Sequence, residues 1–301
     1  MRFFVFIRIH KYAKIYNVNQ KVLLRLTPGI DTHTYEAINT GKVDSKFGVA
    51  IETGQAEQAF KSILELKNVN LMGFHCHIGS QVFDSDTFLR GAKIMIDFIK
   101  LVKEKYGFIT EVLDLGGGYG VRYKDTDPYI DIEDNIREVS EFVKKYCDEM
   151  EVKLPYILME PGRSIVADAG MTLYTVGTIK QIPGYKNYVS VDGGMSDNPR
   201  FALYGAEYTL YLAEKMNEKN EFNCSVVGRC CESGDIIQEN VDLPIPKTGD
   251  ILAVLTTGAY NYSMASNYNR LQRPPVVMLK DGLDYVAVKR ETLDDIIAND
   301  V

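Results

Sequence analysis

A regular alternation of short apolar runs with helical patterns is the feature that most constrains this chain. The apolar runs are Val22–Leu26, Leu71–Ile78, Val112–Leu115 and Tyr156–Met159. Between them, Phe88–Tyr106 repeats its apolar residues at spacings of four and three, which places them on one face of a long helix. Strands that are apolar nearly throughout are typical of a parallel sheet covered on both faces. The alternation therefore predicts an α/β fold of the TIM-like (β/α)8 barrel type.

The pattern changes after about Ala169. Runs rich in Val, Tyr, Thr and Ile now recur, separated by turn residues such as Pro183-Gly184 and Asp281-Gly282. This pattern predicts an antiparallel, all-β domain, and we expect one helix in it near Ala206–Glu218. The length of 301 residues also exceeds one ordinary domain. We therefore divide the chain into a partial barrel, residues 1–168, and a C-terminal β domain, residues 169–301.

The barrel part is short. A full (β/α)8 barrel has eight strands and typically about 250 residues. The patterns predict only four or five barrel strands before the β domain begins. We therefore expect that the chain lacks the front part of its barrel.

Charge and cysteine content limit the possible partners. The net charge is −7, and acidic and basic residues are interspersed. This argues against nucleic acid or an anionic membrane as the main partner. The five cysteines are odd in number and form no Cys-x-x-Cys pair, so neither a disulfide framework nor a metal site is indicated. No segment is long enough to span a membrane, and Phe3–Ile9 is too short for a signal peptide. We expect a cytoplasmic protein that binds a small molecule.

The stretch Gly73–Gln81 is the first that suggests chemistry. It is expected to be a strand that stops at Gly79, with His75 and His77 on one face and Cys76 on the other. An imidazole at the strand end, followed by a glycine and the Ser80 hydroxyl, suits a flat, phosphorylated ligand. The alternative is that both histidines are core residues, which is the commoner case on an apolar strand.

Two further strand ends carry polar or flexible residues. Gly116-Gly117-Gly118 follows the strand at Val112–Leu115, and glycines let the backbone approach a phosphate closely. Glu160 and Arg163 follow the next strand. The carboxylate could accept a hydrogen bond from a heteroaromatic N–H, and the guanidinium could bind a carboxylate or a phosphate. A flexible turn and a surface ion pair remain the alternatives.

The β domain contributes three more motifs, Asp192–Arg200 followed by Tyr204, Cys230–Asp235 and Gly258–Ser266. A cysteine beside a glutamate, as in Cys231-Glu232, could donate or accept a proton. The other cysteines (Cys76, Cys147, Cys224 and Cys230) are interpreted as buried structural thiols. In the third motif we expect Tyr260, and not Tyr262, to have a role.

The order and spacing of these motifs resemble the fold type III pyridoxal-phosphate-dependent amino-acid decarboxylases. The matching stretches are Leu23–Gly29, Asp44–Gly48, Gly73–Gln81, Leu113–Gly120, Glu160–Val166, Val191–Arg200, Cys231–Asp235 and Thr257–Asn269. The Glu232-Ser233 pair is similar to the branch that acts on diaminopimelate, since ornithine-type enzymes place an aspartate after their cysteine. The resemblance implies decarboxylation of meso-2,6-diaminopimelate to L-lysine and CO₂, a step of lysine biosynthesis.

The resemblance also implies roles toward the cofactor, pyridoxal 5′-phosphate. His77 would stack on the pyridine ring, and Tyr260 would contact the cofactor and the substrate. Glu160 would pair with the ring nitrogen and keep it protonated, which makes the ring an electron sink when CO₂ departs. The residues that would hold the phosphate are Ser80, Gly117, Gly118, Gly162 and Arg163.

Toward the substrate, the resemblance implies that Arg163, Arg200 and Tyr204 bind the distal carboxylate. Glu232 would bind the distal amino group, and Cys231 would protonate the α-carbon. In this family the cysteine and the glutamate come from the partner subunit, so a homodimer with shared active sites is implied. A bidentate arginine selects a carboxylate well.

One family feature has no counterpart in this sequence. The family joins its cofactor to a lysine on an early barrel strand, in a Tyr-Ala-x-Lys type motif, whereas Tyr12-Ala13-Lys14 stands at the wrong place in the order. We therefore expect a C-terminal portion of such an enzyme, with little or no turnover by itself. The alternatives are another basic amino-acid decarboxylase of this fold and a catalytically inactive homologue that binds a partner.

Overall fold

The computed structural model describes residues 3–30 and 45–301. Asp44, the first residue of the stretch Asp44–Gly48, therefore lies outside the described residues. The chain forms two compact units, residues 1–121 with 128–162, and residues 122–127 with 163–301. The short segment 122–127 thus packs with the second unit although both its neighbours in sequence belong to the first. We refer to these as the first and second unit.

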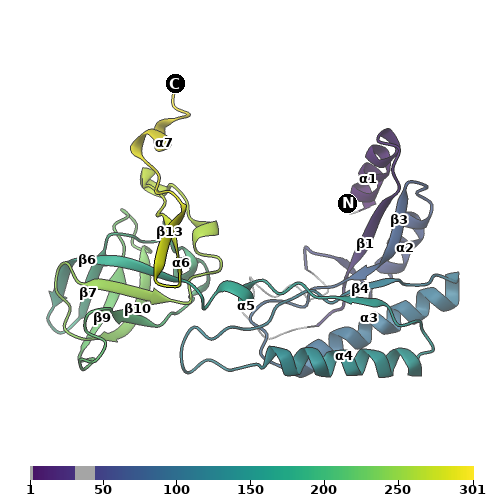
Figure 1. Ribbon diagram of the computed structural model, residues 1–301, viewed down its shortest axis with the longest axis horizontal. Coiled ribbons are helices and arrows are strands. Elements are labelled where there is room, and N and C mark those ends of the chain that lie inside the picture. Colours follow the sequence, from purple (N-terminus) through teal and green to yellow (C-terminus); the bar gives the residue numbers. More distant parts are fainter. Residues whose placement is uncertain (1–2, 31–44) are drawn as a thin grey trace. The chain divides into compact units, whose positions relative to one another are not determined.

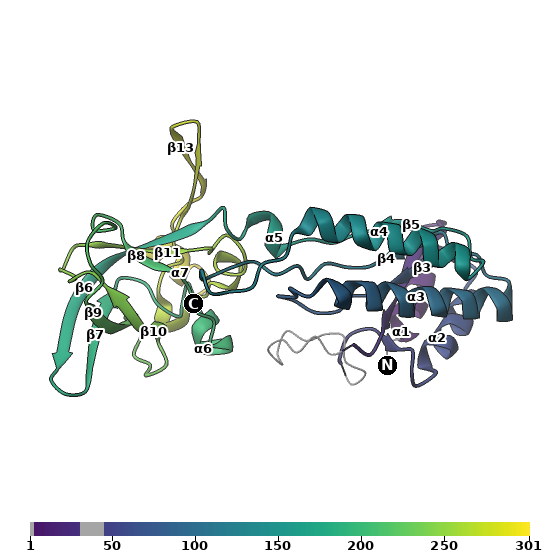
Figure 2. The ribbon, with the colours of Figure 1, turned by 90° about the horizontal axis from the view of Figure 1, so that it is seen from below.

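The first unit contains a five-stranded parallel sheet in the order β2-β1-β3-β4-β5. The strands are β1 (Gln20–Thr27), β2 (Val49–Ala50), β3 (Val69–His75), β4 (Val112–Asp114) and β5 (Tyr156–Leu158). The helices are α1 (Phe3–Ile15), α2 (Gln55–Leu64), α3 (Ser85–Tyr106) and α4 (Ile132–Glu149). Helices α3 and α4 lie side by side along the sheet (Figures 1 and 2). The parallel sheet and the βα alternation predicted from the sequence are confirmed.

An aromatic cluster forms the centre of the first unit's core. Phe74 on β3 is fully buried, and its ring centroid lies 5.1 Å from that of Phe98 on α3 and 6.1 Å from that of Phe60 on α2. The ring centroid of Phe108 lies 5.1 Å from that of Phe60 and 6.1 Å from that of Phe74. These rings join two helices to the central strand β3. The carboxyl end of β3 is therefore held in place by the apolar residues that come just before it on the same strand.

The second unit is built around a six-stranded sheet in the order β10-β9-β7-β6-β11-β8. Its strands are β6 (Met171–Ile182), β7 (Lys186–Val191), β8 (Leu210–Leu212), β9 (Phe222–Val227), β10 (Ile236–Leu243) and β11 (Ile251–Leu255). The sheet is antiparallel as predicted, except that β7 and β9 pair in parallel. Two short helices, α5 (Arg163–Val166) and α6 (Arg200–Tyr204), belong to the same unit.

The helix predicted near Ala206–Glu218 is wrong. That stretch contains β8, whose Leu210 and Leu212 are buried while Tyr211 between them is partly exposed. This two-residue alternation fits a strand, and Leu210, Tyr211 and Leu212 pair with β11. Pairing with β11, a strand much further along the chain, therefore accounts for the strand at this position.

A two-stranded hairpin, β12 (Val276–Lys280) and β13 (Leu283–Val288), forms a sheet of its own. It projects away from the six-stranded sheet (Figure 2). Helix α7 (Leu293–Ile297) follows and begins with a capping box at Thr292 and Asp295. Among the residues that the structure describes, no helix is both long enough and apolar enough to cross a membrane.

Candidate active site

The carboxyl ends of β3, β4 and β5 bring three polar side chains together. His75 is the last residue of β3 and pairs in register with Asp114, the last residue of β4. Asp114 in turn pairs with Leu158 at the end of β5, and Glu160 follows two residues later. Because the three strands are parallel neighbours, their carboxyl ends meet at one edge of the sheet. We call His75, Asp114 and Glu160 the edge triad.

The edge triad is tightly spaced. Nε2 of His75 lies 3.1 Å from Oε2 of Glu160, and one ligand atom from each of the three residues lies within 4.8 Å of the others. The His75–Glu160 distance is that of an ion pair, although the pair lacks the angle of a linear hydrogen bond. The His75 side chain is 16% exposed and that of Glu160 is 57% exposed. The arrangement offers a carboxylate to solvent, backed by an imidazole, and its donor set would also suit a divalent cation.

His77 lies just beyond the strand. The sequence predicted a strand reaching Ile78, but β3 ends at His75, so His77 stands in the loop that follows. Nδ1 of His77 accepts a hydrogen bond from the backbone N–H of Gly117 at 3.3 Å. Burial lowers the pKa of His77 to about 4, and the nearby charges of Arg25 and His75 act in the same direction. The ring is therefore neutral at pH 7, and its orientation is set by the glycine-rich turn.

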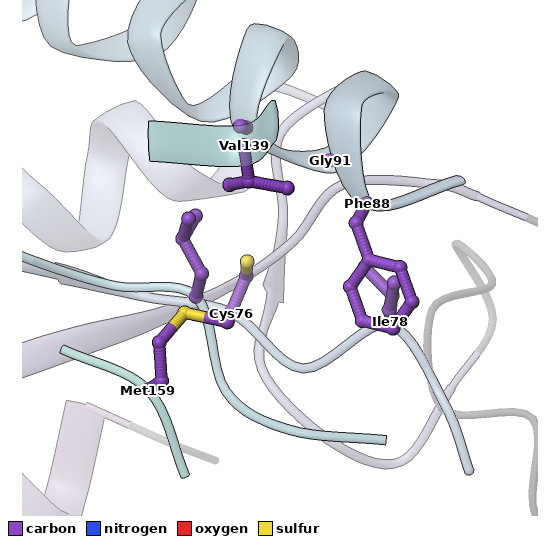
Figure 3. Close-up of a pocket in the computed structure, with 8 residues that line it drawn as sticks. Cys76, Ile78, Phe88, Gly91, Val139 and Met159 are labelled. Carbon is purple, nitrogen blue, oxygen red and sulfur yellow. The ribbon is translucent and has the colours of Figure 1, made fainter. Parts of the chain in front are cut away.

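Cys76 faces the opposite side, as the strand alternation predicts. It lines a small apolar pocket under the sheet together with Ile78, Phe88, Val139 and Met159 (Figure 3). Burial raises the pKa of its thiol to about 12. A protonated, enclosed thiol of this kind is inert. The burial predicted for Cys76, Cys147 and Cys224 is confirmed, whereas Cys230, predicted to be buried as well, is only partly buried.

The glycine-rich turn at Gly116–Gly118 is packed directly against this edge. A Cβ atom at Gly117 would lie 2.1 Å from the carbonyl oxygen of Glu160, and one at Gly118 would lie 2.2 Å from that of Gly79. Gly118 also has a φ of +110°, a conformation that side chains disfavour. The backbone of Glu160 is fixed here too, since its N–H donates to the Gly116 carbonyl at 2.8 Å. The turn thus forms a bare-backbone cradle between the histidine loop and Glu160.

The second unit buries two arginines among tyrosines. Arg163 is 8% exposed and its Nη1 donates to the Tyr123 hydroxyl at 2.5 Å. Arg200 is 6% exposed and its Nη1 donates to the Tyr208 hydroxyl at 2.7 Å. The ring of Tyr123 lies under both guanidinium groups, at 5.8 Å from that of Arg163 and 4.8 Å from that of Arg200. We call this set the arginine–tyrosine cluster.

Tyr260 and Tyr204 lie in the same unit. The Tyr260 ring stands 4.5 Å from the Arg163 guanidinium, is 45% exposed, and has a backbone φ of +64°. A bulky residue in this left-handed conformation is uncommon and is often found at binding sites. Tyr204 is the last residue of α6 and is half-buried, four positions after Arg200. The predicted residues Arg163 and Tyr260 are therefore in contact.

Cys231 and Glu232 occupy an exposed loop that one buried aspartate holds in place. Both side chains are exposed, and the Tyr268 hydroxyl donates to Glu232 Oε2 at 3.4 Å. The carboxylate of Asp235 accepts from the backbone N–H groups of Met195 and Cys230, each at 2.6 Å. The loop therefore presents an accessible thiol and carboxylate on a fixed backbone.

Several residues of these clusters had no role assigned from the sequence. They include His75, Asp114, Tyr123, Tyr208 and Asp235. Tyr123 lies in the segment 122–127, which packs with the second unit. No local sequence pattern indicates this packing. For His75 a signal existed, since the strand alternation places it on the same face as His77.

Comparisons with known proteins agree with this geometry. Residues 5–167 match the family model described as the pyridoxal-binding domain of pyridoxal-dependent decarboxylases. The chain is thus a member of the pyridoxal-dependent decarboxylase family. Among its relatives, diaminopimelate decarboxylase from Bacillus subtilis (strain 168) is 46% identical over 280 residues, which cover 93% of this chain and 64% of that protein.

Two further relatives carry the same name. Diaminopimelate decarboxylase from Staphylococcus aureus (strain COL) is 45% identical, with 97% of this chain and 68% of that protein covered. The crystal structure of the enzyme from M. jannaschii in complex with L-lysine has a TM-score of 0.90 and 36% identity, covering 99% of this chain and 68% of that one. The chain thus spans about two thirds of the length of these relatives, and 64% of the first.

The described residues of the first unit fit the family's cofactor. A phosphate needs close backbone approach, and Gly116–Gly118 present a backbone without side chains beside the loop that carries His77 and Ser80. A cationic pyridine nitrogen needs an accessible carboxylate, which Glu160 offers at the neighbouring strand end. The pyridine ring of the cofactor needs a flat partner to stack on, and the uncharged imidazole of His77 is such a partner. All three requirements are met by residues of one sheet edge.

Proposed function

We propose that this chain provides the cofactor-binding and substrate-binding parts of a decarboxylase that converts meso-2,6-diaminopimelate to L-lysine and CO₂. The observation that carries the proposal is the sheet edge on which His77, Glu160 and the bare-backbone cradle lie together. The names of the relatives support the particular substrate. The buried guanidinium of Arg200 supports a substrate with a second carboxylate.

Toward the cofactor, the proposed roles follow from the chemistry of each group. Pyridoxal phosphate, when bound, supplies the electron sink for the electron pair that stays on the α-carbon when CO₂ leaves. Glu160 holds a proton on the ring nitrogen by opposite charge, and His77 orients the ring by packing its neutral face against it. Ser80, Gly117, Gly118, Gly162 and Arg163 bind the phosphate, and the glycines let it approach the backbone closely.

Toward the substrate, Arg163, Arg200 and Tyr204 bind the distal carboxylate, and Glu232 binds the distal amino group. Tyr260 contacts the cofactor and the substrate, and its ring already contacts Arg163, one of the residues that bind them. Cys231 delivers a proton to the α-carbon. A site built to pair both distal groups rejects substrates that lack them, because its buried polar groups would lose their partners.

We further propose a homodimer in which Cys231 and Glu232 serve the site of the partner subunit. Their exposure on a rigid loop supports a role across a subunit boundary. All five cysteines are free, which supports work in a reducing compartment such as the cytoplasm. Mixing a Cys231→Ala variant with a Glu160→Gln variant, both made in the completed protein described below, tests the dimer, because a mixed dimer would contain one intact site and regain activity. Two inactive variants that stay inactive when mixed contradict shared sites.

The proposed reaction is tested with a completed protein, in which this chain is joined to the segment of the Bacillus subtilis relative that has no counterpart here. We expect CO₂ release from meso-diaminopimelate and at least about a hundredfold less from L-lysine or L-ornithine. Equal turnover of L-ornithine would assign the protein to another substrate class. For the chain by itself, pyridoxal phosphate binding is measured by titration calorimetry, and absence of binding contradicts the assignment of the cofactor site.

A further inference from the structure

We infer that His75 is a positioning residue: it holds the Glu160 carboxylate where that group meets the nitrogen of the cofactor ring. The inference rests on the proposed function and adds to it a residue beside the proposed cofactor contacts. It starts from the 3.1 Å separation between His75 Nε2 and Glu160 Oε2.

The two halves of Glu160 are restrained very differently. Its backbone is fixed, because the N–H donates to Gly116 and the carbonyl oxygen packs against Gly117. Its side chain is 57% exposed and has three rotatable bonds. A long exposed side chain loses little freedom unless a partner holds its end. His75 is the described residue placed within ion-pair distance of that end.

His75 is itself well placed for this task. It ends β3, its side chain is 16% exposed, and Nε2 is fully buried. Asp114 stands on β4, the strand between β3 and β5, with one ligand atom within 4.8 Å of both other residues. Its Oδ1 accepts a hydrogen bond from the backbone N–H of Gly116 at 2.8 Å, so this carboxylate is held by the glycine turn, and the imidazole of His75 faces the end of Glu160. The direction in which Glu160 points is therefore set by a ring that belongs to a rigid strand.

Other groups near the triad do not replace His75. The Nδ1 atom of His77 already accepts from Gly117, so this ring is oriented by the glycine turn. Arg25 pairs in register with His75 from β1 and acts on His77 through its charge. Glu160 also acts on His77 through its charge. Cys76 is a further titratable group near the triad, since the charge of Asp114 acts on its thiol, but burial keeps that thiol protonated.

The first test measures the pair without any cofactor. In the 301-residue chain with labelled histidine, the NMR signal of the His75 imidazole should shift in a Glu160→Gln variant, while that of His10 should not. His10 belongs to the same unit, where its Nδ1 accepts from the Asn68 N–H. An unchanged His75 signal means that the two side chains do not interact, and it overturns the inference.

The second test measures the consequence for the cofactor, in the presence of a chelator so that no divalent cation competes. We expect His75→Asn, whose amide is too short to reach Glu160, to bind pyridoxal phosphate about tenfold more weakly. His75→Gln can place an N–H near the position of Nε2 and should bind within about twofold of the unmodified chain. The matched change His10→Asn should alter nothing. Equal affinities of the His75→Asn variant and the unmodified chain overturn the inference.

A third readout separates positioning from general loosening of the fold. With ¹⁵N-labelled pyridoxal phosphate, the NMR signal of the pyridine nitrogen reports its protonation. His75→Asn should move this signal toward that of Glu160→Gln, and His75→Gln should restore it, at unchanged melting temperature. Failure of the unmodified chain to bind the cofactor counts against the proposed function. Tight binding with no change on substitution of His75 leaves that function intact and removes only His75 from it.

Discussion

The two units hold their charged groups in opposite ways. At the edge of the first unit, carboxylates of Asp114 and Glu160 stand beside imidazoles, and the outer carboxylate is more than half exposed. In the second unit, the guanidinium of Arg200 is buried and its partners are the neutral hydroxyl and ring faces of tyrosines. One region offers accessible negative charge, and the other keeps positive charge on an uncharged support. The first suits a cationic ring nitrogen and the second suits an anionic ligand group.

The two units keep their charged groups available to a ligand by different means. A carboxylate loses little by facing water, so it only needs direction, and one strand-end histidine supplies this. A buried guanidinium must be hydrogen-bonded, but a carboxylate partner from the protein would occupy the face that a ligand needs. Phenol hydroxyls and aromatic faces satisfy the group without neutralising it. Substitutions in each unit test this contrast.

The largest effect is expected in the core of the first unit. Phe74→Ala removes a fully buried ring that packs on Phe98 and Phe60, and should cost roughly 4 kcal/mol in the free energy of unfolding. Amide exchange should accelerate in β3 and α3 and stay unchanged in β6 and β7. Urea titration measures the loss of unfolding free energy, and amide exchange measures the local opening of each unit. The exposed Tyr185→Ala variant is the control. Equal acceleration in both units would mean that they unfold together.

A second prediction concerns the arginine–tyrosine cluster. Arg200→Met in the completed protein removes the charge but keeps most of the volume, and should lower kcat/KM for diaminopimelate by about two orders of magnitude. The loss should appear mainly in KM, because the distal carboxylate does not react. Arg137→Met on the exposed face of α4 is the control. Unchanged kinetics would remove Arg200 from the binding site.

A third prediction concerns the pH dependence of stability that His77 gives to the first unit. His77 has a pKa of about 4 in the folded chain, lowered mainly by burial, against about 6.5 when unfolded. The unfolded chain therefore takes up a proton between these values, so stability is complete above pH 6.5 and falls as pH drops toward 4. From pH 7 to 5 the loss should be about 2 kcal/mol. The His77→Gln variant should lose most of this pH dependence. The measurement is urea unfolding of β3 and α3 at each pH. If the free energy of unfolding still falls between pH 7 and 5 in the variant, other groups cause the pH dependence.

The smallest effect is expected at Tyr123. Tyr123→Phe keeps the ring under both arginines but removes the hydroxyl that accepts from Arg163. The free energy of unfolding should fall by about 1 kcal/mol, because a buried donor loses its acceptor. Tyr129→Phe, in an exposed tyrosine, is the control. A change equal to that of the control would show that the Arg163 guanidinium relies on its other contacts.

Much of the fold could be predicted because periodicity reports burial. The strands of the first unit have nearly continuous apolar runs, and α3 and α4 have regular apolar stripes that end where the helices end. The helix predicted near Ala206–Glu218 failed for the converse reason. Its strand β8 is three residues long and is specified by pairing with β11, which lies much further along the chain.

The order of the motifs along the chain is enough to identify residues that could carry the chemistry: His77, Glu160, the glycine turn, Arg200 and Cys231. The residues that support them become visible only in the folded chain. His75 on β3 meets Glu160 after β5 across the intervening strand β4, Tyr123 reaches the arginines because residues 122–127 pack with the second unit, and Asp235 links two loops forty residues apart. Local patterns encode burial and turn geometry. Contacts between distant segments depend on register and packing, which no local pattern contains.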